Sequence, residues 1–257
     1  IIFDLEDAVA PDAKEAARAN AVAAAGSGQY GHRELTIRCN GLETPWGSAD
    51  LEAAATSGAA AVVVPKVGSV AHVDAISAAL DAADAPASMR IWAMIETPTA
   101  IFDVRAIAAH PRVAVLVMGT NDLARELRAE LVPGRGPLLP HLATALLGAR
   151  EADKVILDGV YNDVRDTDGF RAECEQGAEL GFDGKTLVHP GQVEPCNEVW
   201  SPTEAEVEHA RRVIEAFDEA VADGRGVATV DGRMIENLHV DNARRVLAVA
   251  DAIAAIS

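Results

Sequence analysis

The alternation of short apolar runs with longer amphipathic segments constrains the fold of this 257-residue chain more than any other feature. Seven apolar runs have the length and the continuous apolar character of strands in a parallel sheet that helices cover. Because helical patterns separate these runs, the sequence predicts repeated strand–helix units. Such units predict an α/β fold, either a doubly wound sheet or a (β/α)8 TIM barrel.

The expected strands are Ile1–Asp7, Glu34–Asn40, Ala60–Val67, Ile91–Thr97, Val113–Thr120, Lys154–Val160 and Asp183–Pro190. The expected helices between them are Asp12–Ala25, Ser48–Ser57, Val70–Ala83, Thr99–Ala109, Leu138–Ala152 and Thr167–Leu180. Asp12 and Glu15 have the spacing of a capping box, which predicts that the first helix begins at this point.

Polar residues at the strand ends favour the barrel, because a barrel gathers the carboxyl ends of its strands at one mouth. These residues are Asp4, Glu6, Arg38, Asn40, Lys66, Glu96, Asp122, Asp158 and His189. The chain has no GxGxxG motif after its first strand and no GxxxxGK[ST] motif, so the sequence gives no support to a dinucleotide or P-loop site. We therefore predict a TIM barrel over residues 1–200. Since only seven strands are found, we expect the first βα unit of the barrel to precede Ile1.

The pattern changes after Pro190. Ser201-Pro202-Thr203-Glu204 combines an N-cap residue, a proline at the first helical position and an acid at N3, which predicts a helix to about Ala222. A short β-like run, Val227–Val230, and a last helix from about Val240 to Ile256 follow. Residues 201–257 are therefore predicted to form a helical extension that packs on a neighbouring subunit.

Charge and apolar run lengths exclude several partners. With 22 basic and 40 acidic residues the formal charge is −18, which repels nucleic acids and anionic membranes. The apolar runs are much shorter than the ~20 residues of a membrane span. No basic segment precedes the first apolar run, and the three cysteines lack the spacing of a metal site. We expect a cytoplasmic protein with no nucleic-acid or membrane partner.

Glu96 and Asp122 carry the strongest chemical signal. They follow consecutive strands and lie 26 residues apart (122 − 96). Two carboxylates at neighbouring strand ends can share one Mg²⁺, which usually takes one or two protein carboxylates and completes its octahedron with substrate oxygens and water. The alternative is structural, with Asp122 capping the next helix and Glu96 in an ion pair.

Arg38, Asp4 and Glu6 form a second candidate group. Arg38 ends its strand and suits either a carboxylate or a developing oxyanion, and an ion pair with Glu6 or Glu96 is the structural alternative. Asp4 and Glu6 are expected to face inward with Arg38 as partner, which leaves open whether Glu6 is catalytic or only positions Arg38. Lys66 fits either an ion pair or anion binding, whereas His189 fits a structural role better than a catalytic one.

Seven ordered motifs resemble the HpcH/HpaI aldolase/citrate lyase family. They are Asp4-Leu5-Glu6-Asp7-Ala8-Val9, Arg38-Cys39-Asn40-Gly41, Val64-Pro65-Lys66, Ile95-Glu96-Thr97, Gly119-Thr120-Asn121-Asp122-Leu123, Gly184-Lys185 with His189-Pro190-Gly191-Gln192, and Arg233-Met234-Ile235-Glu236. The resemblance implies a TIM barrel, usually a homotrimer or hexamer, that cleaves or forms a C–C bond in acyl-CoA thioesters such as citryl-, malyl- or citramalyl-CoA.

The resemblance also implies residue roles. Glu96 and Asp122 would bind Mg²⁺, Arg38 would stabilise the enolate oxygen, and Lys14 and Lys66 would bind the coenzyme A thioester. The acid of the last motif would reach a neighbouring subunit's site and exchange a proton with substrate. That acid is usually Asp in the family, whereas this chain has Glu236, which is one methylene longer.

The main functional prediction is therefore a Mg²⁺-dependent lyase that acts on an acyl-CoA and an oxo acid. One alternative is a thioesterase that hydrolyses a malyl-CoA-type substrate in the same site. Another is a subunit that binds an acyl carrier without catalysis, which the substitution at Glu236 would allow. A phosphoenolpyruvate-type barrel also uses Glu, Asp and Mg²⁺ but does not explain the last motif.

Overall fold

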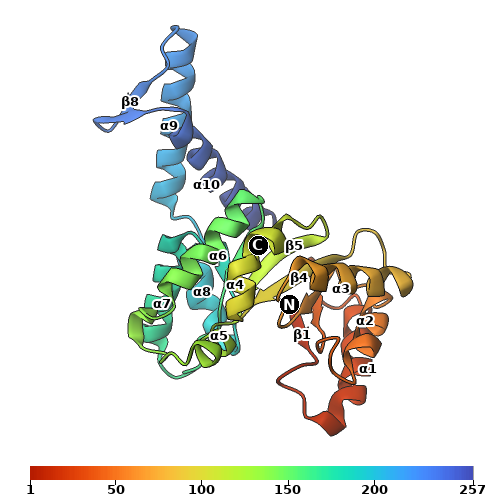
Figure 1. The fold of residues 1–257 in the computed structure, drawn as a ribbon. Coiled ribbons are helices and arrows are strands. Elements are labelled where there is room, and N and C mark those ends of the chain that lie inside the picture. The colour runs from red at the N-terminus through yellow and green to blue at the C-terminus, as the bar shows by residue number, and fades with distance from the viewer. Residues whose placement is uncertain (257) are drawn as a thin grey trace. The chain divides into compact units, whose positions relative to one another are not determined.

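The computed structural model describes residues 1–256, and the chain divides into two compact units, one of residues 1–193 and one that starts at Glu194 (Figure 1). The sequence places the corresponding boundary at residues 200 and 201. The difference is the helix α8 (Val193–Trp200), which is not predicted from the sequence and which follows a short turn at Pro190–Gln192 after the last strand.

The first unit contains a seven-stranded parallel sheet whose strands follow one another in chain order. The strands are β1 (Ile2–Asp4), β2 (Thr36–Arg38), β3 (Ala61–Val64), β4 (Arg90–Ile95), β5 (Val113–Met118), β6 (Val155–Asp158) and β7 (Gly184–Lys185). Each of the seven predicted strands is present, and all neighbours pair in parallel. The unit is thus an α/β structure resembling a TIM barrel, with β1 and β7 at the two edges of the described sheet.

The helices of this unit connect successive strands. They are α1 (Lys14–Ala25), α2 (Gly47–Ala55), α3 (Val70–Ala82), α4 (Pro98–Ala109), α5 (Thr120–Leu127), α6 (Leu139–Glu151) and α7 (Thr167–Leu180), with short 3-10 turns η1 (Pro11–Ala13), η2 (Pro133–Arg135) and η3 (Pro190–Gln192). Within residues 1–256, no helix has both the length and the apolar character needed to traverse a lipid bilayer.

Two predicted helix starts are wrong. Asp12 and Glu15 do not form a capping box, because Asp12 lies inside η1 and α1 begins at Lys14 after Ala13 without a side-chain cap. The helix predicted from Ser201 is α9 (Glu204–Ala222), and its N-cap is Thr203. Thr203 accepts a hydrogen bond from the backbone N–H of Glu206, whose side chain accepts from the backbone N–H of Thr203. The true capping box therefore lies two residues beyond the predicted one.

The sheet interior is aliphatic, which explains how a chain poor in aromatic residues forms a core. β3 is buried along its whole length, and β5 is buried at every residue but one. Val63, Met94, Val115 and Val117 pack together on one side of the strands. Burying such side chains stabilises the fold by roughly 1.5–3 kcal/mol each. This packing fixes the positions of the strand ends.

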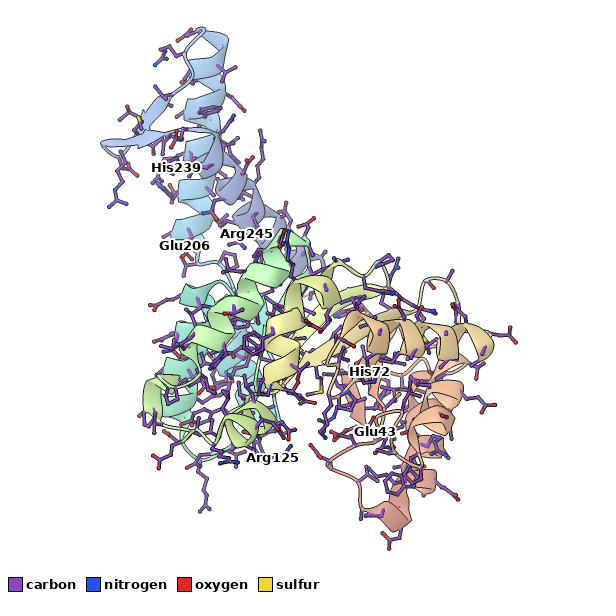
Figure 2. All side chains as sticks on the ribbon, in the orientation of Figure 1. Glu43, His72, Arg125, Glu206, His239 and Arg245 are labelled. Atoms are coloured by element: carbon purple, nitrogen blue, oxygen red, sulfur yellow. The ribbon has the colours of Figure 1, made fainter. Side chains whose placement is uncertain are left out.

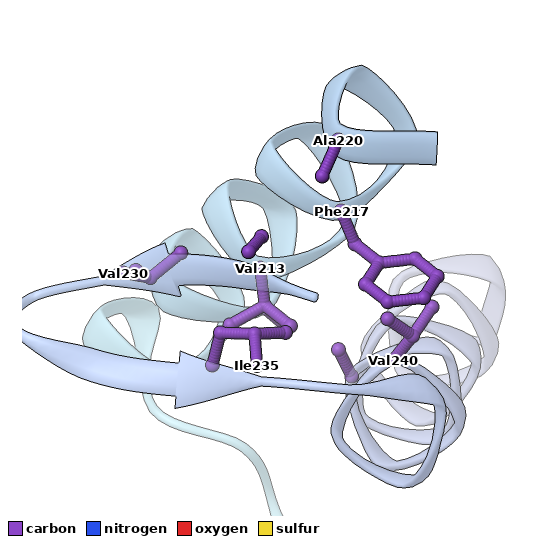
Figure 3. Close-up of a cluster of buried hydrophobic side chains, with 9 residues drawn as sticks. Val213, Phe217, Ala220, Val230, Ile235 and Val240 are labelled. Carbon is purple, nitrogen blue, oxygen red and sulfur yellow. The ribbon is translucent and has the colours of Figure 1, made fainter. Parts of the chain in front are cut away.

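The second unit has a small core of its own (Figure 3). Its elements after α8 are α9, the hairpin of β8 (Ala228–Val230) and β9 (Arg233–Ile235), and α10 (Asn237–Ile256). Val213, Phe217 and Ala220 of α9 pack against Val230 and Ile235 of the hairpin, together with the start of α10. The hairpin turns at Asp231-Gly232, and the last helix begins three residues earlier than predicted.

Candidate active site at the strand ends

A cavity of about 350 Å³ lies at the carboxyl ends of the parallel strands. The polar or charged residues in its lining are Asp4, Asp7, Arg38, Glu96, Thr120, Asn121, Asp122 and Thr186. Apolar residues such as Val63, Met94 and Val117 line it as well. The cavity therefore combines an apolar wall with convergent charged groups, as small-molecule sites usually do.

Arg38 pairs with two carboxylates from the end of β1. Its Nε and Nη2 atoms each donate to one oxygen of Asp4 at 2.6 Å, and its Nη1 atom lies 2.8 Å from Glu6 Oε2. β1 and β2 are in register with Asp4 opposite Arg38, so the pairing follows from the strand alignment. Asp7 is largely exposed and 3.8 Å from Arg38. The expected pairing of Asp4 and Glu6 with Arg38 is present, but Asp7 lines the cavity together with Asp4, whereas Glu6 does not.

The electrostatics keep this group charged. Burial alone would lower the pKa of the Arg38 guanidinium, but the hydrogen bonds and charge of Asp4 and the charge of Glu6 raise it. Burial likewise opposes ionisation of Asp4, yet Arg38 and two backbone N–H groups bring the pKa of Asp4 below its usual value. Arg38 is therefore a fixed cation, and because a guanidinium has five N–H groups, two remain free to face a ligand.

Glu96 is almost completely buried at the end of β4, with 1% of its surface exposed. Its Oε1 atom accepts a hydrogen bond of 2.6 Å from the backbone N–H of Lys66, and its other oxygen lies against Gly119. A side chain at position 119 would collide with this carboxylate, so glycine is needed there. Burial, with repulsion from Asp122 and Glu6, raises the pKa of Glu96 to about 7 despite the Lys66 N–H.

Asp122 lies in the first turn of α5, directly after β5, and its side chain is 17% exposed. Its Oδ1 atom is 2.6 Å from Nη2 of Arg125. Arg125, which is labelled in Figure 2, lies one turn further along the same helix. Asp122 does not cap α5, since Gly119 holds the N-cap position. The structural alternative of a capping role is therefore wrong, although the ion pair with Arg125 is real.

These carboxylates fit a magnesium ion. Among the residues that the structure describes, no cationic group contacts the buried carboxylate of Glu96, which faces the same cavity as Asp122. Among residues 1–256, no three His, Cys, Asp or Glu side chains are grouped as in a closed metal site. Two protein carboxylates facing an open cavity match the way Mg²⁺ is usually held, whereas a structural zinc site needs about four protein ligands.

Lys66 joins the two groups of acids. Its Nζ atom is 3.3 Å from Glu6 Oε1, and 40% of its side chain is exposed. We use the term mouth cluster for the charged residues at these strand ends. The mouth cluster consists of Asp4, Glu6, Arg38, Lys66, Glu96 and Asp122.

Lys14, the other predicted ligand of the thioester, is buried beneath the mouth cluster. Its ammonium group donates to the carbonyl oxygens of Leu5 and Glu6 at 2.7 Å and to Oδ1 of Asn40 at 2.8 Å. Its three N–H donors are thereby used. In this structure Lys14 fixes the backbone that carries Glu6, and contact with the thioester remains a prediction.

Glu236 belongs to the second unit, between β9 and α10. Its backbone N–H donates to Nδ1 of His239 at 3.1 Å, and its side chain is half-buried. Its proposed action on a neighbouring subunit's site is a prediction that concerns another copy of the chain.

A second charged group lies at the ends of β6 and β7. We call it the buried cluster, and it consists of Arg135, Asp158, Glu173 and Lys185. Asp158 accepts from Nη1 of Arg135 at 2.7 Å and from Nζ of Lys185 at 3.0 Å, while Lys185 also donates to Glu173 at 2.7 Å. Asp158 is predicted to lie at the mouth, but its side chain is fully buried and does not line the cavity.

Other residues of the site escaped the sequence analysis. Asn121 and Asn162 exchange two amide hydrogen bonds of 3.1 and 2.8 Å, which join the start of α5 to the loop after β6. The Arg125–Asp122 pair was detectable from its i,i+3 spacing. His189 accepts a hydrogen bond from the backbone N–H of Gly191 and caps η3, which agrees with the structural role expected of it.

The fold and the cavity define a class of protein: an α/β protein resembling a TIM barrel, with paired carboxylates at adjacent strand ends. Comparison with known proteins identifies the family. The model of the HpcH/HpaI aldolase/citrate lyase family matches residues 1–190. The chain belongs to this family, and the prediction made from the sequence motifs is confirmed.

Two groups of characterised relatives are similar over nearly the whole chain. A (3S)-malyl-CoA thioesterase of Cereibacter sphaeroides (strain KD131) is 51% identical over 99% of this chain and 87% of its own length. The citrate lyase subunit beta of Escherichia coli (strain K12) is 36% identical over 98% of this chain and 85% of its own length. The family thus includes a hydrolase and a lyase subunit among proteins similar to this chain.

Solved structures agree in fold. The CitE protein of Mycobacterium tuberculosis, solved with magnesium, acetoacetate and coenzyme A, superposes with a TM-score of 0.78 at 26% identity and covers 97% of this chain and 89% of its own. A citrate lyase structure from Burkholderia xenovorans has a TM-score of 0.83 at 18% identity, covering 98% of this chain and 83% of that one. The second similarity establishes the fold alone.

Proposed function

We propose that this protein is a Mg²⁺-dependent thioesterase that hydrolyses a malyl-CoA-type 3-hydroxyacyl-CoA. The observation that supports hydrolysis best is the 51% identity to (3S)-malyl-CoA thioesterase over almost the entire chain. This similarity favours the alternative in the sequence analysis over its main prediction of a lyase. The acid-rich cavity is compatible with both reactions.

Glu96 and Asp122 would hold the metal ion in this proposal. When bound, Mg²⁺ would neutralise these carboxylates and orient the oxygens of the hydroxy-acid half of the substrate. Glu96 is suited to this role because its backbone hydrogen bond from Lys66 fixes its orientation. The magnesium and coenzyme A in the related CitE structure support the assignment.

Arg38 would stabilise the negative charge on the thioester oxygen. Asp4 holds the guanidinium through two hydrogen bonds, so its remaining N–H groups point in fixed directions. One preorganised donor to an oxyanion contributes roughly 3–4 kcal/mol to the stabilisation of a transition state. The same residue would stabilise an enolate in a lyase, so Arg38 does not distinguish the two reactions.

Glu6 is the proposed base. Burial raises the pKa of Glu6, although the neighbouring Arg38 and Lys66 oppose the shift. A water molecule would lose its proton to Glu6 as its oxygen forms a bond with the thioester carbon. The C–S bond would then break, and the proton would pass to the sulfur, giving free coenzyme A and the intact hydroxy acid.

The second candidate is the lyase, which similarity to citrate lyase subunit beta supports. In that reaction a base would take the proton of the substrate hydroxyl, the C–C bond would break, and Glu236 from an adjacent chain would protonate the enolate. This version requires the homo-oligomer that the family resemblance implies, with the second unit lying between subunits.

Product analysis tests the proposal. Malyl-CoA is incubated with the protein with and without Mg²⁺, and acetyl-CoA or propionyl-CoA is also tested with glyoxylate, pyruvate and oxaloacetate. We expect free coenzyme A and malate from malyl-CoA, only with Mg²⁺. Formation of acetyl-CoA and glyoxylate would establish the lyase instead, and binding of an acyl carrier without turnover of any thioester would identify a non-catalytic subunit.

A further inference from the structure

Lys66 has an unusual backbone conformation for its position. Its φ angle is +52°, in the left-handed region that non-glycine residues rarely adopt. The residue immediately follows Val64-Pro65 at the end of β3. Strain of this kind costs on the order of 1–3 kcal/mol and persists where the surrounding structure imposes it. Here the turn places both the backbone N–H and the ammonium group of Lys66 beside acids of the mouth cluster.

The two parts contact different acids. The backbone N–H of Lys66 donates to Glu96, whereas the ammonium group lies beside Glu6. Burial alone would lower the pKa of Lys66, but Glu6, Asp122 and Glu96 together raise it, so the side chain stays protonated. Arg38 is committed to Asp4 and Glu6, and Arg125 contacts Asp122 at the exposed side. Arg125 also acts by its charge on Asp122 and Glu96, from the exposed side. Lys66 differs from it because its backbone N–H holds Glu96 and its ammonium group contacts Glu6.

We propose that the Lys66 ammonium group is a placeholder cation, which offsets the carboxylates of the mouth cluster before the metal binds and competes electrostatically with Mg²⁺ afterwards. The proposal rests on the metal site of the proposed function. It assigns the side chain of Lys66 a positioning role that sets metal affinity, separate from the role of its backbone N–H in orienting Glu96. A flexible side chain that is 40% exposed can swing into solvent when a divalent ion arrives.

The test separates charge from backbone geometry. Lys66→Gln removes the charge at similar length, Lys66→Arg retains the charge, and Lys66→Gly retains the left-handed turn and the N–H while removing the side chain. Lys154→Gln is the matched control, because it makes the same change in net charge near the amino end of β6, outside the cavity. Mg²⁺ affinity is measured by isothermal titration calorimetry without substrate, and thermal unfolding is followed with and without Mg²⁺.

We expect Lys66→Gln and Lys66→Gly to bind Mg²⁺ about tenfold more tightly than the wild type, since a like charge near the ion is gone. Without Mg²⁺, Lys66→Gln should unfold about 2–4 °C lower, whereas Lys66→Gly also relieves the strain of the left-handed turn. The metal should raise the melting temperatures of both variants more than that of the wild type. The Mg²⁺ affinities of Lys66→Arg and Lys154→Gln should match that of the wild type within a factor of about two to three, because isolated exposed charges have small effects.

Unchanged or weaker Mg²⁺ binding in Lys66→Gln, with a larger KM for the thioester, would overturn the proposal and make Lys66 a substrate ligand. If Lys66→Gln is too unstable to study, Lys66→Gly decides the same question. If Lys154→Gln binds Mg²⁺ more tightly by the same factor, the change in affinity reflects net charge alone, and the proposal is also overturned. A wild type that binds no Mg²⁺ overturns the metal assignment together with this proposal, whereas failure of hydrolysis alone shows up only in the product assay.

Discussion

The mouth cluster and the buried cluster stand at strand ends of one parallel sheet, yet their charges are arranged differently. The buried cluster has two acids and two bases, and its Asp158 and Lys185 side chains are inaccessible to solvent. The mouth cluster has four acids and two bases, and its Asp4, Arg38, Glu96 and Asp122 line a cavity. Arg125 offsets Asp122 only from an exposed position. Arg135 and Glu173 of the buried cluster also line a cavity, of about 330 Å³, so charge balance is the difference between the two clusters. A balanced group stabilises a fold, whereas an acidic excess facing a cavity requires a cation.

The contrast shows that position at a strand end is not sufficient to define a site. Asp158 and Glu96 are equally buried acids at the ends of β6 and β4. Asp158 has two cationic partners in contact, whereas within residues 1–256 the partner of Glu96 is a backbone N–H. Charge balance among the neighbours therefore separates scaffold from site in this molecule.

The largest expected effect comes from Glu96→Gln. We predict that Mg²⁺-stimulated release of coenzyme A falls about 10³-fold or more, because a metal contributes several kcal/mol to charge stabilisation. The metal-free variant should be at least as stable as the wild type at pH 8, since a buried charge is removed. A thiol assay over a range of Mg²⁺ concentrations and thermal unfolding measure the two quantities. Retention of full Mg²⁺ stimulation would remove Glu96 from the metal site.

Asp158→Asn should lower the stability of the fold and leave Mg²⁺ binding unchanged, which is the opposite of the effect of Glu96→Gln. Breaking a buried charge network leaves Arg135 and Lys185 without their partner, which costs about 3–5 kcal/mol of unfolding free energy. Urea denaturation measures this loss, and Asp153→Asn, an exposed aspartate, is the control. Protein that remains folded should bind Mg²⁺ with unchanged affinity. A loss of Mg²⁺ binding without a loss of stability would abolish the distinction between the clusters.

Arg38→Ala is predicted to lower kcat by about 10²–10³-fold with Mg²⁺ affinity largely retained, because Arg38 acts on the reacting oxygen. Arg38→Lys keeps the charge but loses the bidentate contact with Asp4, so its kcat should lie between those of Arg38→Ala and the wild type. Steady-state kinetics on malyl-CoA provides the measurement. Equal kcat in Arg38→Ala and the wild type would leave Arg38 a structural ion pair only.

The pH dependence of metal binding is the smallest effect. The pKa of Glu96 is raised from 4.5 to about 7 in the folded protein. Between pH 4.5 and pH 7 the folded protein therefore binds a proton that the unfolded chain does not bind. The metal-free protein therefore loses stability as the pH rises through this range. Below pH 7, Mg²⁺ must displace the proton on Glu96 in order to bind. We expect Mg²⁺ affinity to be about tenfold weaker at pH 6 than at pH 8. Calorimetry at both pH values should show this difference, and equal affinities at pH 6 and pH 8 would contradict the expectation.

Much of the fold was accessible from the sequence because the strands are continuous apolar runs. All seven were located, but their ends were placed too far along the chain. The last one was predicted to reach Pro190 and ends at Lys185, because polar residues that follow a buried strand share its extended conformation. Helix α5 was missed since it starts directly after β5, and α8 was missed because it contains Pro195.

The candidate site was accessible where strand register decides it. Asp4 and Arg38 pair because β1 and β2 align them, and the period of two places Glu6 nearby. The buried cluster was not accessible, because Arg135 reaches Asp158 from a turn that has a left-handed backbone, 23 residues away. The commitment of Lys14 to the Leu5 and Glu6 carbonyls was hidden for a similar reason, since no sequence pattern marks a side chain that binds backbone.

A crystal structure with Mn²⁺ in place of Mg²⁺ tests the central claim most directly, because anomalous scattering locates the ion without reference to activity. The account predicts one anomalous peak between Glu96 and Asp122, about 2.0–2.3 Å from a carboxylate oxygen of each, the range of hard octahedral cations. It predicts none beside Asp158 or Glu173. A peak at the buried cluster, or none between Glu96 and Asp122 at saturating Mn²⁺, would contradict the account.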